Sequence, residues 1–253
     1  MLHLISFADE NYTNAGLQLI EESKNKKCFK TIKVYGNNWW KKNKGNSDEE
    51  KCKLGNGYWV WKPKIINERL NDPDIKMGDV IVYIDAGKSL IDSKEKIERV
   101  AYNTKDIQYS STGYKEINWT MKKVWDYFNM DIDTKLYQAS AHNIIVRKTP
   151  NTLYIINELA NTKPYYFGIF DSNKQCGEFI EHRHDQSLFS MLMHKYNIKA
   201  TRNFLSYKRN DEAVNTSWLN TSRRYKLYNV SEQWWTHEYK MKNKLSSLVN
   251  LGE

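Results

Sequence analysis

The chain has 253 residues, with 39 Lys+Arg against 30 Asp+Glu and a formal net charge of +9 at pH 7. This length suits one domain with a sizeable core, and the positive balance favours anionic partners such as nucleotides, nucleic acid or acidic membranes. No apolar run is long enough to span a membrane and no signal peptide is apparent, so we expect a soluble cytoplasmic protein. Three widely spaced cysteines, Cys28, Cys52 and Cys176, fit free thiols and neither a disulfide framework nor a zinc site.

The first part of the chain predicts two strands separated by a helix. The apolar stretches that predict these strands are Leu2 to Phe7 and Thr31 to Tyr35. Between them, Thr13 can cap a helix with Leu17 and Ile20 on its inner face. Residues 36–57 are polar and aperiodic, so we expect a long surface loop, which in compact domains often carries function.

The middle of the chain continues the alternation. Pro63 suits the first turn of a helix, and Asp92 and Glu95 stand in capping-box spacing at the start of a second. The elements predicted here are a helix bearing Ile65, Ile66 and Leu70, a strand at 80–84, a helix from about Asp92, a short strand at 106–110, and a helix over 115–128 with Ile117, Met121, Val124 and Phe128 on one face.

The last part of the chain is similar but less regular. The elements predicted here are a strand at 142–148, a helix from Thr149-Pro150 with Leu153, Ile156 and Leu159 inward, a short strand at 167–170, a helix with Leu188, Leu192 and Tyr196 on one face, and a final helix near 231–249. Alternating strands and helices favour one α/β domain with a largely parallel or mixed sheet.

One strand ends on an acid, in the segment "GDVIVYIDAG" at 78–87. Its apolar run fits a strand covered on both faces. Asp85 then lies at the carboxyl end of a central strand, the edge where open α/β sheets bind ligands. The alternative is that Asp85 caps the next turn through its side chain.

A second polar cluster, "EHRHDQS" at 181–187, precedes an apolar helix. Burying such a cluster unpaired would be costly, so we expect it to line a polar cleft. His184 and Asp185 offer metal ligands or a general base, and Arg183 a forked contact with phosphate. Asp185 could instead be the N-cap of the helix.

Four segments together resemble the successive motifs of GT-A-fold glycosyltransferases, of a group found in large DNA viruses and bacterial surface-polysaccharide loci. They are "GYWVWKP", "GDVIVYIDAG", "YQASAHNIIVRKTP" and "FIEHRHDQSLFSML". The resemblance runs from about residue 2 to 198. It implies an α/β GT-A (Rossmann-like) domain over 1–253, with a mixed, mostly parallel sheet flanked by helices and a basic aromatic C-terminal region at 200–253.

The resemblance also implies a metal site. In that fold an Asp-x-Asp motif holds Mn²⁺ or Mg²⁺ against the donor diphosphate, and Asp85 matches its first acid. Position 87 is glycine instead of the second acid, so His184 or Asp185 would supplement Asp85 as a metal ligand. Without a metal, Lys62 and Arg183 would neutralise the leaving diphosphate.

Further site residues follow from the same resemblance. Asp185 matches the base of inverting members, and Asp185-Gln186 looks like the "DQ" of certain retaining members, so the stereochemistry stays open. Trp59 and Trp61 either stack on a sugar or base or straddle a core edge. The expected donor-binding residues are Ser6, Asp9, Trp59, Trp61, Lys62, Asp85 and Arg183.

The expected function is metal-assisted transfer of a sugar from a nucleotide-sugar, UDP-sugar first, to a glycan or glycoprotein, in the host cytoplasm if the protein is viral. One alternative is a non-catalytic nucleotide- or sugar-binding module. Another is a basic nucleic-acid-binding protein, suggested by the aromatic basic segments 222–228 and 234–244, which equally suit peripheral membrane contact. A nucleotidyltransferase would normally carry a Gly-rich phosphate loop after the first strand, and "FADENYTNAG" lacks one.

Overall fold

The central element of this computed structural model, which describes residues 1–168, 178–202 and 204–209, is a five-stranded sheet. The strands, in spatial order, are β2 (Thr31–Tyr35), β1 (Leu2–Phe7), β3 (Val80–Ile84), β8 (Asn143–Arg147) and β5 (Ile107–Gln108). β1 pairs in parallel with β2 and β3, whereas β8 runs antiparallel to both β3 and β5. The expected mixed, mostly parallel α/β sheet is therefore confirmed.

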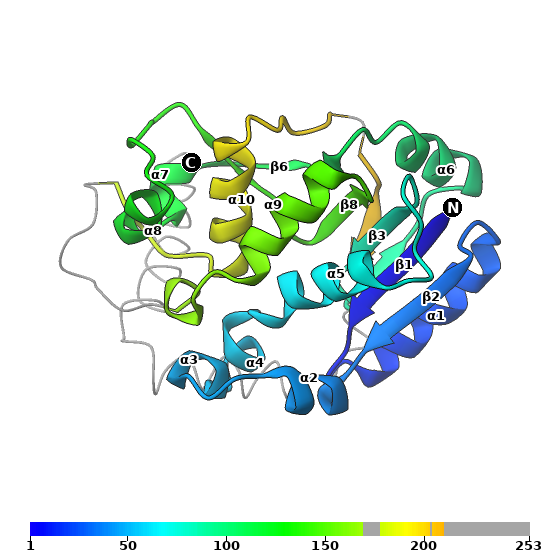
Figure 1. Cartoon of the computed structure of the whole chain (residues 1–253). Coiled ribbons are helices and arrows are strands. Elements are labelled where there is room, and N and C mark those ends of the chain that lie inside the picture. The colour runs from blue at the N-terminus through cyan, green and yellow to red at the C-terminus, as the bar shows by residue number, and fades with distance from the viewer. Residues whose placement is uncertain (169–177, 203, 210–253) are drawn as a thin grey trace, which may run out of the picture. The chain divides into compact units, whose positions relative to one another are not determined.

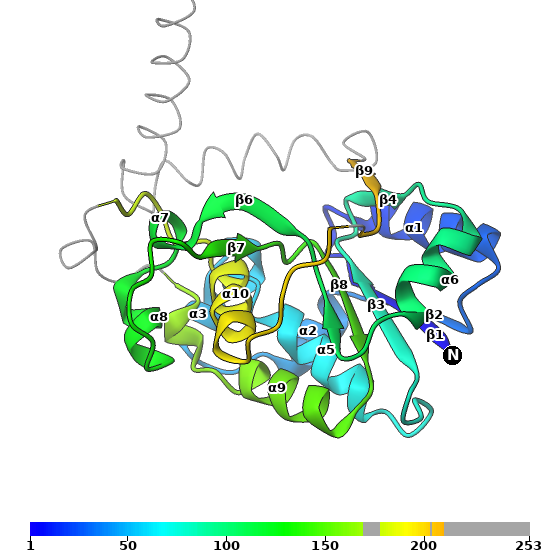
Figure 2. The ribbon, with the colours of Figure 1, turned by 90° about the horizontal axis from the view of Figure 1, so that it is seen from above.

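Helices cover both faces of this sheet (Figures 1 and 2). They are α1 (Thr13–Lys26) and α6 (Lys94–Tyr102) on one face, and α5 (Trp61–Asn71) and α9 (Pro150–Ala160) on the other. Within β3, Val82 and Ile84 join the core under α1 and α6, while Tyr83 joins the core under α5 and α9. Because side chains alternate along a strand, Asp85 follows Tyr83 toward α5 and α9.

A smaller layer extends this α/β unit. Its elements are β6 (Ser111–Lys115), β7 (Tyr137–Ala139), α7 (Glu116–Trp119), α8 (Lys122–Tyr127), the 3₁₀ helix η1 (Pro164–Tyr166) and α10 (Asp185–Lys195), with β4 (Lys88–Leu90) and β9 (Tyr207–Arg209) forming a separate two-stranded sheet. The helix α10 packs against β7, α8 and α9, beneath the β6–β7 pair (Figure 2). This packing carries the start of α10, at Asp185, into the interior.

Several predicted elements are confirmed at or near their expected bounds. The strands β1 and β2 match exactly the predicted ranges, and β3 is the strand that precedes Asp85. At the start of α9, Thr149 and Thr152 form a reciprocal capping box and Pro150 is the first helical residue. The N–H groups that a helix leaves unpaired at its first turn are thus partly satisfied by side chains.

The segment 36–57 was expected to be a loop, and this expectation is wrong. It contains three short helices, α2 (Asn37–Asn43), α3 (Asp48–Lys51) and α4 (Gly55–Tyr58). Helices of one or two turns are too short to show a periodic apolar face. Tertiary packing holds them instead, since Trp40 is buried in the core.

The helix α1 has a different inner face from the one expected. Its buried residues are Ala15, Gly16, Leu19 and Ser23, whereas Leu17 is 60% exposed. Small residues let this helix lie close to the sheet, and a Cβ added at Gly16 would come within 2.8 Å of the Ala8 Cβ. Thr13 is the first helical residue, and the preceding cap position belongs to Tyr12.

Other boundaries also shift. Ser93, and not Asp92, caps α6 by accepting from the Lys96 backbone N–H. The helix expected over 115–128 is two helices, α7 and α8, although its four apolar residues are all buried. The strand expected at 106–110 shortens to β5.

Some expectations lie partly or wholly outside the described residues. At 167–170, Phe167 follows η1 and is no strand residue, while 169–170 are not described. The helix near 231–249, Cys176 and the aromatic basic segments 222–228 and 234–244 all lie outside. Within the described residues, no helix has the length and apolar character needed to cross a membrane.

Candidate functional site

Three charged side chains from distant parts of the chain meet beyond the end of β3. Lys62 comes from the first turn of α5, Asp85 directly follows β3, and Asp185 is the first residue of α10. The Lys62 Nζ lies 2.5 Å from Asp185 Oδ2 and 3.3 Å from Asp85 Oδ1. We call Lys62, Asp85 and Asp185 the charge cluster.

The charge cluster is anchored on its inner side. The Tyr83 hydroxyl donates to Asp85 Oδ1 at 2.5 Å, and Lys62 Nζ donates to the Ala141 carbonyl at 3.2 Å. Only 6% of the Lys62 side chain is exposed, compared with 28% of the Asp85 side chain. The cluster is therefore buried at Lys62 and open to solvent at Asp85.

Asp85 and Asp185 share one ammonium, yet their pKa values shift in opposite directions. Burial raises the pKa of Asp185 to about 6, although the Lys62 ammonium acts to lower it. Burial acts on Asp85 in the same direction, but the Lys62 ammonium and the hydrogen bond from Tyr83 outweigh it and hold the pKa of Asp85 below its usual value. For Lys62 burial disfavours the charge, yet the two carboxylates prevail and raise its pKa. At neutral pH all three groups are ionised, and Asp185 is the one that exchanges its proton nearest to neutrality.

His142 adjoins the charge cluster and was not expected from the sequence as a site residue. The β3–β8 register pairs Ile84 with Asn143, and the Asp85 N–H donates to the His142 carbonyl at 2.9 Å, so these two residues are cross-strand neighbours. Burial lowers the pKa of His142, and the cations Lys62, Lys88 and Arg183 lower it further against the attraction of Asp85. His142 is therefore a neutral imidazole among cations. The strand pairing, which no short motif encodes, is what reveals it.

His184 and Arg183 precede Asp185 in the chain, but their side chains contact other residues than the charge cluster. His184 occupies the N-cap position, so the alternative interpretation of Asp185 as the cap is wrong. The His184 ring stacks on Tyr58 at 4.9 Å, and its Nδ1 lies 2.6 Å from the Phe167 carbonyl oxygen. The Arg183 guanidinium lies 4.1 Å above the Trp119 ring, with 38% of the side chain exposed.

Two expected donor-binding residues are packed into the core. Ser6 is fully buried, and its hydroxyl donates to the Ile84 carbonyl at 2.6 Å. Trp61 is 6% exposed and stacks on Phe7 at 4.1 Å, as the core interpretation of this residue predicts. The alternation of strand and helix faces directs both side chains toward the core, and donor binding by these two residues stays a prediction.

Asp9 and Trp59 remain near a surface. Asp9 accepts from the backbone N–H groups of Asn11 and Tyr12 and from the Asn56 side chain, so it joins the loop after β1 to α4. Trp59 is partly buried, and its ring lies 5.4 Å from the His184 ring. Both residues are therefore held by the loops around the end of the sheet.

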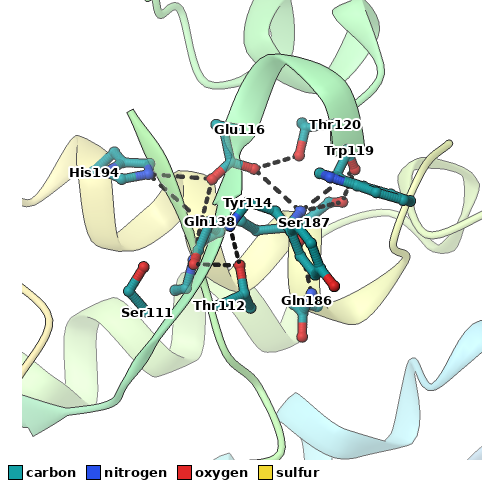
Figure 3. Close-up of polar contacts among 12 residues, drawn as sticks. Ser111, Thr112, Tyr114, Glu116, Trp119, Thr120, Gln138, Gln186, Ser187 and His194 are labelled. Carbon is teal, nitrogen blue, oxygen red and sulfur yellow. Dashed lines mark hydrogen bonds and ion pairs between the residues drawn. The ribbon is translucent and has the colours of Figure 1, made fainter. Parts of the chain in front are cut away.

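Gln186 is positioned by a buried polar network (Figure 3). The Gln186 Nε2 donates to Gln138 Oε1 at 2.7 Å, and the Gln138 Nε2 faces Glu116 Oε1 at 3.4 Å. Glu116 is completely buried and also accepts from the hydroxyls of Thr120 and Ser190. Because a carboxylate only accepts, it orients the Gln138 amide, which in turn orients the Gln186 amide with its oxygen directed away from Gln138.

Glu116→Ala is expected to destabilise the fold by about 2–3 kcal/mol, because it leaves several buried donors without their charged acceptor. Urea denaturation at pH 7 measures this change. Asp126→Ala is the control, since its ion pair with Lys122 is exposed on both sides and such pairs contribute about 1 kcal/mol or less. Equal losses in the two variants would contradict a stabilising role of the network.

The expected Mn²⁺ or Mg²⁺ would have to be held by these side chains. Such hard cations require several oxygen ligands. Among the described residues, no group of three or more His, Cys, Asp and Glu side chains is arranged to hold a metal. His184 is turned to the Phe167 carbonyl, and Lys62 already lies between Asp85 and Asp185. The described residues therefore do not fit a divalent metal.

No protein-family model and no curated protein sequence matches the chain. Among solved structures it is similar to a glycosyltransferase involved in the glycosylation of the major capsid of PBCV-1, with a TM-score of 0.38 and 11% identity over 65% of this chain and 69% of that one. Galactosyltransferase LgtC, in complex with donor and acceptor sugar analogs, has a TM-score of 0.37 and 11% identity over 74% of this chain and 69% of that one. A putative glucose-1-phosphate thymidylyltransferase from Bacillus anthracis has a TM-score of 0.40 and 8% identity over 92% of this chain and 99% of that one.

Proposed function

We propose that this protein is a GT-A-type glycosyltransferase that takes a sugar from a nucleotide-sugar, a UDP-sugar first, and transfers it to a glycan or glycoprotein. The observation that carries the proposal is the charge cluster, in which one ammonium and two carboxylates converge at the carboxyl end of β3. This reaction requires two groups. One is a cation that stabilises the leaving diphosphate, and the other is a titratable carboxylate that takes the proton of the acceptor.

The location of the charge cluster supports a ligand site. The chain leaves β1 through α1 to reach β2 on one side, and β3 lies on the other side of β1. Such a reversal of strand order opens a crevice outside the carboxyl ends of the two strands, where α/β sheets bind ligands. Asp85 and the loop of Asp9 follow β3 and β1 at this point.

The electrostatics favour an anionic ligand. Lys62, Lys88 and Arg183 all act on His142, and the neutral imidazole adds an N–H donor beside them. A diphosphate held near these groups would be stabilised as its negative charge grows. Asp9 and Trp59 are the proposed contacts for the rest of the donor.

Transfer breaks the bond between the sugar C1 and the diphosphate oxygen and forms a bond between C1 and an acceptor oxygen. The electron pair of the broken bond leaves with the nucleoside diphosphate, and the acceptor hydroxyl proton passes to a base. We assign this base to Asp185, because its pKa of about 6 leaves it ionised yet able to take a proton near neutral pH. Gln186, oriented through Gln138, is the proposed polar contact beside the reacting carbon.

A thermal-shift titration of the full chain tests this proposal. UDP or a UDP-sugar at 100 times its Kd is expected to stabilise the fold by about 2.7 kcal/mol, because it binds only the native state. His142→Ala should weaken this effect, while Lys122→Ala, which removes an exposed ion pair with Asp126, should not.

The second readout is release of UDP from UDP-sugars. Saturable binding without turnover would identify a non-catalytic binding module. No response to any nucleoside diphosphate, together with strongly salt-dependent binding of oligonucleotides, would replace the proposal by nucleic-acid binding.

A further inference from the structure

We infer that the Lys62 ammonium is the resident cation of this site, so that binding of the donor diphosphate requires no divalent metal. This inference rests on the proposed function. It differs from the metal-assisted reaction that the sequence resemblance implies.

The first support is the coordination of the ammonium. Three oxygens surround Nζ, namely Asp185 Oδ2 at 2.5 Å, the Ala141 carbonyl at 3.2 Å and Asp85 Oδ1 at 3.3 Å. The contact with Ala141 is a hydrogen bond, and the contacts with Asp85 and Asp185 are ion pairs. Lys62 thus occupies the position between two carboxylates that a shared metal ion would need.

The second support is the confinement of Lys62. The residue lies between Trp61, which is stacked on Phe7, and Pro63, in the buried first turn of α5. Its Nζ is 5.3 Å from the centre of the Tyr83 ring, and 5% of the residue is exposed. A metal could take this position only by displacing the ammonium from both carboxylates, and a buried charge without a partner is strongly unfavourable.

The third support is the small number of carboxylate oxygens that are available to a divalent metal. Asp85 offers one carboxylate, the residue two positions later is Gly87, and Asp185 is already paired with Lys62. Asp85 Oδ1 also accepts from Tyr83. A single partly engaged carboxylate is a poor site for a cation that prefers about six oxygens.

The first experiment uses the unmodified full chain without nucleotide. Titration with Mn²⁺, followed by electron paramagnetic resonance, is expected to show only the free-ion signal up to millimolar concentration. Binding of one Mn²⁺ per chain that is lost in Asp85→Asn would overturn the inference. This measurement is independent of whether the protein binds nucleotides.

The second experiment compares UDP binding by calorimetry in EDTA and in Mn²⁺. The expected Kd values differ by less than threefold. A Kd at least tenfold lower in Mn²⁺, with the difference abolished by Asp85→Asn, would overturn the inference. Failure of UDP to bind in either buffer would refute the proposed function, and the Mn²⁺ titration would still decide the question of the cation.

The third experiment removes the ammonium from between the two carboxylates. In Lys62→Ala the two carboxylates lose their shared cation, so Mn²⁺ or Mg²⁺ is expected to raise the melting temperature of this variant and not that of the wild type. Lys64→Ala is the matched control, because Lys64 lies on the same helix but pairs with Glu50. A folded Lys62→Ala protein with no response to either metal would contradict the inference; if the variant does not fold, the wild-type Mn²⁺ titration decides.

Discussion

Replacing Asp185 by asparagine is expected to lower the rate of sugar transfer, or of donor hydrolysis, by about 10²- to 10⁴-fold, the usual contribution of a positioned general base. Asparagine keeps the size of the side chain but cannot take a proton. The measurement is UDP release at saturating donor. Asp126→Asn, at an exposed carboxylate, is the control and should leave the rate unchanged.

The same carboxyl predicts the pH dependence of the rate. Burial raises the pKa of Asp185 to about 6, so the wild-type rate should rise as the pH increases through about 6 and then level off. Carbon-13 NMR of the aspartate carboxyl groups can locate this titration directly, because its signal disappears in Asp185→Asn. A rate that does not depend on pH between 5 and 7 would remove Asp185 from the role of base.

The sign of the accompanying stability change follows from linkage. Between the ordinary aspartate pKa of about 3.9 and about 6, the folded state retains a proton that the unfolded state has lost. The contribution of Asp185 to stability therefore falls as the pH rises through this window. The melting temperature of Asp185→Asn should fall less than that of the wild type over the same range.

Replacing Lys62 by methionine is expected to destabilise the fold by about 3–5 kcal/mol, the usual cost of removing one partner from a buried ion pair. Methionine fills a similar volume, but Asp85 and Asp185 then face each other without a cation. Urea denaturation at pH 7 measures the loss. The control, Lys64→Met, removes a lysine of which 25% of the side chain is exposed and should cost less.

A double variant separates charge from packing. Lys62→Met combined with Asp185→Asn removes the ammonium and one carboxylate, so part of the lost stability should return. The loss in Lys62→Met should also diminish at pH 4–5, where Asp185 is protonated. Additive losses in the double variant would show that the carboxylates do not depend on Lys62.

The elements with strong local patterns were predictable from the sequence. The strand β3 is a continuous apolar run, β1 and β2 are rich in β-branched and other apolar residues, and α9 begins with a capping box. Patterns of this kind depend on neighbours in sequence. The helices α2 to α4 are too short to carry such a pattern, and their stability comes from burial of residues such as Trp40.

The site was predictable only in part, for the same reason. Asp85 and Asp185 stand out because an acid at the end of an apolar strand and a charged run before an apolar helix are local signals. The burial of Ser6 and Trp61 was not predictable from the motifs, because it depends on which face of the strand and of the helix packs on the core. His142 had no local signal at all.

The sequence by itself determined that an apolar strand delivers a carboxylate to the edge of an α/β sheet, because hydrophobic patterning and strand geometry act over a few residues. Only the tertiary structure decided which charge meets that carboxylate. Lys62 and Asp185 are 123 positions apart (185 − 62) and come together because α5 and α10 are both packed at the end of β3. Burial at that meeting point, a property of the packed fold and of no single segment, sets the pKa of Asp185 and the position of the cation.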